Sequence, residues 1–182
     1  TATYGQMAFK TAGSEAMRID ESGNVGIGTS SPVYALQVGD AATTSQASFA
    51  LASTTSGTCN IRFGDGTSGT TASRGRIEYD HSEDSLALWT VSAERMRIDS
   101  SGNLLVGTTD TTVYDNNTNT TADNGLNLRG DGKLDAARYN GIVLGLNLTG
   151  DDGTIVDFRK SGATVGSIGT TSGDLTISSS AS

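Results

Sequence analysis

Short runs in which apolar and polar residues alternate recur along the chain, and each run is typical of a β-strand with one face in a core. Patterns with a helical period are nearly absent, so we expect under ~10% helix, against roughly a third in an average protein. The pattern therefore predicts an all-β fold. The expected strands lie at residues 6–10, 34–38, 46–53, 59–63, 76–80, 85–89, 142–148, 155–158, 166–168 and 175–177.

One stretch of this pattern occurs twice. Residues 15–29 and 94–108 match without a gap at an offset of 79 positions, the separation of Met17 and Met96. Each copy predicts a strand, a Ser-Gly-Asn turn and a second strand. Glycine suits the left-handed position of a short hairpin loop, and asparagine tolerates unusual dihedral angles. The predicted structural turn residues are Gly23, Asn24, Gly102 and Asn103.

The apolar residues of both hairpins alternate onto one face, while arginines and acids occupy the other. We expect the apolar face to point at a core shared between chains, and the arginines to pair with nearby acids. Leu105 stands where the first copy has Gly26, and we expect it to face away from the hairpin core, towards a neighbouring chain. The trimer core candidates are Met17, Ile19, Val25, Ile27, Met96, Ile98, Leu104 and Val106.

The offset divides the chain into repeat units of roughly 80–90 residues. Residues 1–32 are predicted to be the end of a preceding unit and residues 33–111 a complete unit. Residues 112–124, rich in Thr, Asn and Asp, predict a linker or exposed loop. Residues 125–182 are a diverged, incomplete copy, in which 155–158, 166–168 and 175–177 correspond to the strands near 61–63, 75–77 and 86–88.

The amino-acid composition favours an assembly of several chains over a single globular domain. Only 35% of the 182 residues are hydrophobic and 5% are aromatic, while 24 are glycine. A lone chain of this kind has little apolar surface with which to offset its ordering entropy. We therefore expect identical chains to share one core, as a homotrimer. Since Thr1 is no initiator methionine, we also expect a longer parent protein.

Net charge removes several classes of partner. A net charge of −8 disfavours nucleic acids and anionic membrane surfaces, because both attract positive charge. No run approaches the roughly 18 apolar residues of a membrane span, so membrane insertion is not expected. Cys59 lies in an apolar alternation and is interpreted as a small buried side chain rather than a reactive thiol.

The densest group of titratable residues surrounds the single histidine, His81. Its carboxylates admit three interpretations: a solvated turn, which we favour, an acid pair for glycoside hydrolysis, or a calcium site. No nucleophile, base and acid arrangement can be assembled, so we expect no catalytic residue, metal or cofactor. The acids are Glu78, Asp80, Glu83 and Asp84.

Two further features are weaker. The tripeptide Arg129-Gly130-Asp131 is interpreted as a loop. Exposed tyrosines stack on sugar rings, a role open to Tyr114 and Tyr139, whereas Trp89 and Tyr79 fall near apolar strands and are expected to pack. The residues that touch any ligand are not identifiable from these patterns.

The repeated hairpins also resemble a known class of sequence. Residues 14–29 and 93–108 are similar to a signature that recurs in bacteriophage tail fibres and related appendage proteins of marine and cyanobacterial phages. Residues 61–65, 75–82 and 157–168 also look like those fibres. The resemblance implies a parallel homotrimer in the virion, made in the bacterial host cytoplasm. In this class an endosialidase-type intramolecular chaperone often follows and is cleaved off, and here it would begin beyond Ser182.

Together these observations predict an all-β, repeat-built fibrous homotrimer with triple β-helical or interleaved β-sheet segments. The expected role is a structural one, an elongated shaft of a phage tail fibre that carries or includes a host-receptor-binding surface. The implied partners are its own copies, other virion tail proteins, and a polysaccharide or protein of the host surface. Two alternatives stay open: a tailspike-like enzyme that degrades polysaccharide, and a non-viral surface adhesin or filament.

Overall fold

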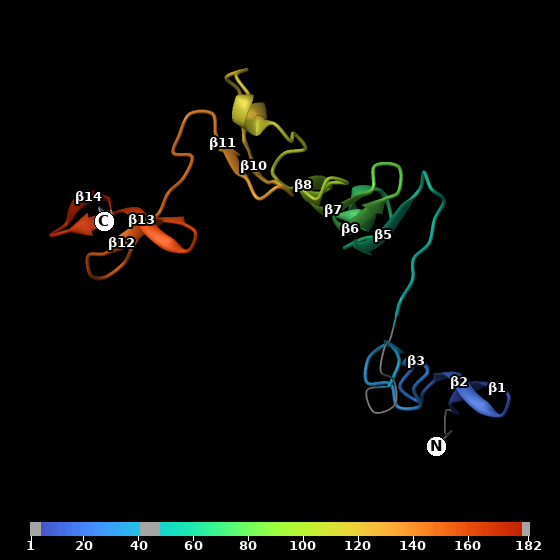
Figure 1. Ribbon diagram of the computed structural model, residues 1–182. Helices are drawn as coiled ribbons and strands as arrows, with labels where there is room; N and C mark the ends of the chain where they lie inside the picture. The colour runs from blue at the N-terminus through green and yellow to red at the C-terminus, as the bar shows by residue number, and fades with distance from the viewer. Residues whose placement is uncertain (1–4, 41–47, 180–182) are drawn as a thin grey trace. The chain divides into compact units, whose positions relative to one another are not determined.

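The computed structural model describes residues 5–40 and 48–179, and the chain divides into two units, Thr1–Thr54 and Thr55–Ser182. Both are built from β-strands, which confirms the predicted all-β class (Figure 1). In the described residues the helical segments are three short 3₁₀ helices: η1 at Gly69–Ser73, η2 at Val113–Asp115 and η3 at Thr121–Asp123.

The first unit holds a four-stranded sheet in which spatial order follows chain order. β1–β2 and β2–β3 are antiparallel hairpins, whereas β4 runs parallel to β3. The strands are β1 Met7–Thr11, β2 Ser14–Ile19, β3 Val25–Ile27 and β4 Leu36–Val38.

The second unit holds a seven-stranded sheet in which every strand pairs antiparallel with the next in the chain. Local pairing of this kind needs only short loops, and four of the six pairs are joined that way. The two longer connections are β5–β6, which contains η1, and β9–β10, which contains η2 and η3. The strands are β5 Thr58–Phe63, β6 Gly75–Asp80, β7 Ser85–Thr90, β8 Ala93–Ile98, β9 Leu104–Val106, β10 Gly125–Leu128 and β11 Leu134–Ala137.

A three-stranded antiparallel sheet lies later in the same unit, formed by β12 Thr154–Lys160, β13 Ala163–Thr171 and β14 Asp174–Ser179. Its register repeats that of β5–β6–β7. Phe63 lies opposite Gly75, and Phe158 lies opposite Gly166. Likewise, the row Ile61–Ile77–Leu88 recurs as Val156–Ile168–Ile177. The segments that correspond in sequence therefore pair in the same way.

The two copies of the hairpin also share one pattern of pairing. Met17 lies opposite Ile27, and Met96 lies opposite Val106. Gly23 and Gly102 have φ angles of 85° and 77°, the left-handed values predicted for this turn. Asn24 and Asn103, in contrast, do not adopt positive φ, so the left-handed position of each turn is the glycine.

Two expected strands are absent from the described residues. Residues 48–53 form no strand, and the start of that prediction, 46–47, lies outside the described part. Residues 142–148 also form none, although they alternate in polarity. A strand needs a hydrogen-bonded neighbour, and neither segment pairs with any strand in the structure. Phe49 and Ile142 are 69% and 74% exposed, so neither side chain is buried in a core.

The positive φ of Gly102 leads to a stability prediction. Alanine there would meet no atom within 4 Å, so its cost comes only from the left-handed backbone. We expect Gly102→Ala to lower the free energy of unfolding by about 1–2 kcal/mol per chain, measured by denaturant titration.

Gly145→Ala is the matched control. Its position is equally open, but its φ lies outside the left-handed range. The control should be neutral or slightly stabilising. Equal stabilities of the two variants would contradict the assignment of strain to the turn.

Candidate functional site

The turn of each hairpin is closed by an aspartate that precedes it. Asp99 Oδ1 accepts hydrogen bonds from the backbone N–H groups of Ser101 and Asn103, both at 2.9 Å, and its Oδ2 accepts one from Asn103 Nδ2 at 2.8 Å. Asp20 makes the same three bonds 79 positions earlier, with Ser22 and Asn24. The asparagines thus serve as donors to the aspartate, a role that the spacing of the motif contains but that dihedral reasoning misses.

These bonds favour the ionised carboxylates. The pKa of Asp20 is lowered, chiefly by the hydrogen bond from the backbone N–H of Asn24. Burial acts in the opposite direction, and the bond from the Asn24 side chain adds to the lowering. At Asp99 burial acts in the raising direction, yet the bonds from Asn103 and Ser101 outweigh it and the pKa is again lowered. The turn is therefore a charge-assisted structure that depends on pH.

The seven-stranded sheet has one apolar face, defined by two rows of side chains. The register aligns them across the strands, so they lie side by side. Their exposure is high for apolar residues: 46% for Ile61, 45% for Ile98 and 56% for Leu134. The rows are Ile61–Ile77–Leu88–Met96–Val106–Leu126–Ala136 and Cys59–Tyr79–Leu86–Ile98–Leu104–Leu128–Leu134.

The predicted trimer core candidates all lie on β2, β3, β8 and β9. Four of them belong to this apolar face, and the other four occupy the matching positions of the first sheet. Ile27, Ile98 and Val106 are 38–45% exposed, and the other candidates are half-buried. Within one chain they form the surface of a sheet rather than the interior of a core. The structure places them together in two groups, one in each unit: Met17, Ile19, Val25 and Ile27, and Met96, Ile98, Leu104 and Val106.

The buried side chains lie on the opposite face. Leu105, Asn127 and Asp135 are paired across β9, β10 and β11 and are 0%, 0% and 5% exposed. η2 lies against β10 and β11, and its Val113 is 1% exposed. The expectation that Leu105 faces a neighbouring chain is therefore wrong. It does point away from the apolar face, but it is fully buried within its own chain, beside Asn127, which binds the Thr111 carbonyl of the β9–β10 connection.

Ion pairs occupy this opposite face beyond the buried patch. Arg97 binds Glu94 at 2.6 Å and Glu83 at 3.0 Å, and Arg18 binds Glu15 in the first unit at 2.5 Å. The predicted pairing of hairpin arginines with Asp20, Asp99 or Glu94 is confirmed for Arg97 and Glu94, whereas Arg18 pairs with the corresponding acid of its own copy, Glu15. Trp89 packs under the guanidinium of Arg76, whose central carbon lies 3.7 Å from the ring centroid.

The carboxylates near His81 do not converge. Glu78 pairs with Arg76, Glu83 with Arg97, and Asp84 accepts a bond from the Tyr79 hydroxyl. Across residues 5–40 and 48–179, no group of three or more His, Cys, Asp or Glu side chains is placed to hold a metal ion. The remaining acid of the cluster, Asp80, accepts bonds from Ser82 as in a turn.

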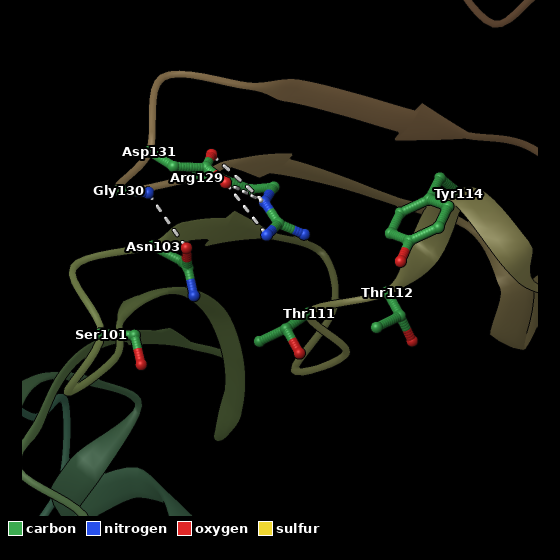
Figure 2. Close-up of a pocket in the computed structure, with 8 residues that line it drawn as sticks. All are labelled: Ser101, Asn103, Thr111, Thr112, Tyr114, Arg129, Gly130 and Asp131. Carbon is green, nitrogen blue, oxygen red and sulfur yellow. Dashed lines mark hydrogen bonds and ion pairs between the residues drawn. The ribbon is translucent and has the colours of Figure 1, made fainter.

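A polar cleft lies where three loops meet at one end of the seven-stranded sheet (Figure 2). The β8–β9 turn, the segment before η2 and the β10–β11 turn form its walls. Its volume is about 500 Å³, which falls in the roughly 300–1,000 Å³ range of ligand pockets. We name it the Tyr114 cleft; it is lined by Ser101, Asn103, Thr111, Thr112, Tyr114, Arg129, Gly130 and Asp131.

The sequence alone gives no reason to connect the segments of this cleft. In the alternation pattern Tyr114 is an exposed aromatic and residues 129–131 are a separate loop. In the structure the Gly130 N–H donates to Asn103 Oδ1 at 3.0 Å, and Arg129 pairs with Asp131 at 3.1 Å. No spacing rule connects residues 101–103, 111–114 and 129–131, so the cleft cannot be found without the register of β8 to β11.

Comparison with known proteins adds no relative: no family model, no curated protein and no solved structure matches the chain.

Among the described residues, the structure contains no helix with the length and apolarity that a membrane crossing requires.

The aspartate-closed turn predicts a specific pH dependence. Because its folded pKa is lowered, ionised Asp20 stabilises the fold above its unfolded pKa of about 3.9, and this contribution is lost as the pH falls through the folded pKa. Asn24→Ala removes the side-chain donor to Asp20. We expect the variant to raise the Asp20 pKa towards the ordinary value, measured by carboxyl-carbon NMR shifts against pH.

Ser22→Ala is the control, since Ser22 donates to Asp20 through its backbone N–H and the substitution keeps that bond. The Asp20 pKa should not change in this variant. The hypothesis fails if the two variants titrate alike.

Proposed function

We propose that this chain is a structural segment of a bacteriophage tail fibre and forms an elongated homotrimeric shaft. The observation that carries the proposal is the continuous apolar face of the seven-stranded sheet, most of which stays exposed in the isolated chain. Of the fourteen aligned positions across seven strands, nine are exposed and five are half-buried in the isolated chain. Exposed apolar patches of this extent mark interaction surfaces.

The composition supports a second copy as the occupant of this face. Burial of apolar surface contributes roughly 25 cal/mol per Å². The described chain has few buried apolar side chains of its own, chiefly Ala87, Leu105 and Val113. Most of its apolar side chains are thus available for contact between chains, which is the distribution expected of a protein that folds as it assembles.

The repeats support a shaft in particular. The hairpin recurs after 79 residues with the same aspartate-closed turn, and the β5–β6–β7 register recurs in β12–β13–β14. Repetition of one module along a chain extends an assembly in one direction. Triple β-helical or interleaved sheet segments are the arrangements we propose for it.

The similarity of residues 14–29 and 93–108 to tail-fibre sequences supports the biological setting that we propose, a virion appendage assembled in the bacterial cytoplasm. The net charge of −8 per chain suits such a role, because it keeps long assemblies apart in solution. Other virion tail proteins would be the partners at the ends of the shaft.

The proposal predicts a stable trimer of three times the 18.6 kDa chain mass, measured by light scattering after size exclusion. Ile98→Lys places a charge on the apolar face, so we expect it to shift the population towards smaller species or insoluble protein.

Thr58→Lys is the control. It adds the same charge on β5, but its side chain alternates onto the opposite face from Cys59 and Ile61. This variant should remain trimeric. A wild-type chain that runs as a stable monomer would refute the proposal.

A further inference from the structure

We propose that the Tyr114 cleft binds a neutral sugar residue. The cleft combines an aromatic ring with a planar ion pair and side-chain amide and hydroxyl groups (Figure 2). A pyranose presents an apolar C–H face and a ring of hydroxyl groups that both donate and accept. The lining of the cleft matches both features.

The aromatic part is Tyr114, which is 54% exposed. The Lys133 ammonium lies 4.0 Å from the centroid of its ring, and Lys133 in turn pairs with the buried carboxylate of Asp135 at 2.7 Å. These contacts fix the ring orientation from one side. The ring also lines the cleft, where it offers its remaining apolar surface to a C–H face.

The polar part is the Arg129–Asp131 pair. Arg129 donates to Asp131 through Nε and Nη2, so its Nη1 takes no part in the ion pair. The Asp131 carboxylate is 59% exposed and has acceptor capacity beyond this pair. Figure 2 shows the guanidinium in the cleft, between Asn103 and Tyr114 in that view. A vicinal pair of sugar hydroxyls can accept from the guanidinium and donate to the carboxylate.

The walls of the cleft are held in place before any ligand arrives. Asn103 accepts from Gly130 N–H while it donates to Asp99, and the fully buried Asn127 donates to the Thr111 carbonyl at 2.9 Å. A side chain at Gly130 would meet the Ser101 carbonyl oxygen at 2.6 Å, so the close approach of the two turns requires glycine. Preformed walls reduce the entropy cost of binding.

Charge selects a neutral sugar over an acidic one. The cation of the cleft is already paired with Asp131, and the chain carries a net charge of −8. An additional carboxylate would meet repulsion rather than a free cation.

The site does not depend on the proposed trimer. It is built within one chain, and Tyr114 follows Val113, which is buried on the face opposite the apolar face. Chains that pack through their apolar faces therefore leave this side of the sheet to solvent.

Saturation-transfer NMR on the full chain tests the proposal. The probes are the methyl glycosides of glucose, galactose, mannose and N-acetylglucosamine, with methyl glucuronide as the acidic comparison. We expect at least one neutral glycoside to receive saturation from the protein. Tyr114→Ala and Arg129→Ala should each weaken its binding about tenfold, and Tyr114→Phe, which keeps the ring, should bind within about twofold of the wild type.

Tyr34→Ala is the matched control, because Tyr34 is 69% exposed and lies in the first unit. Circular dichroism of each variant establishes that it is folded, and light scattering reports its assembly separately from its binding. Binding that survives in both cleft variants, equal loss in Tyr34→Ala, a response to methyl glucuronide alone, or no transfer to any neutral glycoside would overturn the sugar site. None of these results would bear on the trimer.

Discussion

A single-layer sheet has two faces, and this chain covers one of them much more than the other. The connection between β9 and β10 folds onto the side of Leu105, Asn127 and Asp135, where it buries Val113 and satisfies Asn127 through the Thr111 carbonyl. The opposite side is covered less: residues 142–144 line a pocket with Leu126 and Leu134, but Ile61 and Ile98 stay 46% and 45% exposed. The covered side is largely polar, whereas the more exposed side is apolar. That inversion is unfavourable for a monomer and favours assembly through the more exposed side.

Repetition in this chain is strict in the hairpins and loose in the strands that come after them. Both hairpins close with the same Asp-Asn turn, yet the next strand pairs parallel in the first unit and antiparallel in the second. The two copies also differ at one matching position, which is Gly26 in β3 and Leu105 in β9. A Cβ at Gly26 would lie 2.7 Å from the Thr29 carbonyl oxygen, so the first copy needs glycine. In the second copy the chain leaves room for a leucine, which becomes the most buried apolar side chain of the sheet.

Alternation and spacing predict the all-β class, most of the strands and the left-handed glycines of the hairpins, because these depend on neighbours close in sequence. The same reasoning fails for residues 48–53 and 142–148, where alternation is present but no strand edge receives the segment. It also misjudges Leu105, since alternation reports the face of a residue and not what covers that face. The Tyr114 cleft cannot be predicted from alternation either, because alternation does not show which distant segments meet. Its walls are 27 residues apart at the Asn103–Gly130 bond, and only the sheet register brings them together.

The cleft therefore belongs to the part of the chain that departs from the repeat. Asn103 performs the same task as Asn24 in its own turn, but it also accepts a bond from the turn that the antiparallel β10 and β11 bring beside it. In the first unit β4 runs parallel to β3, so the turn at the end of β4 does not lie next to Asn24. A repeated module thus supplies the scaffold, and a change in the direction of one strand supplies the second wall. This arrangement separates two surfaces of the sheet: the apolar rows, through which we propose that chains meet, lie on one face, and the polar recess lies at the end of the other.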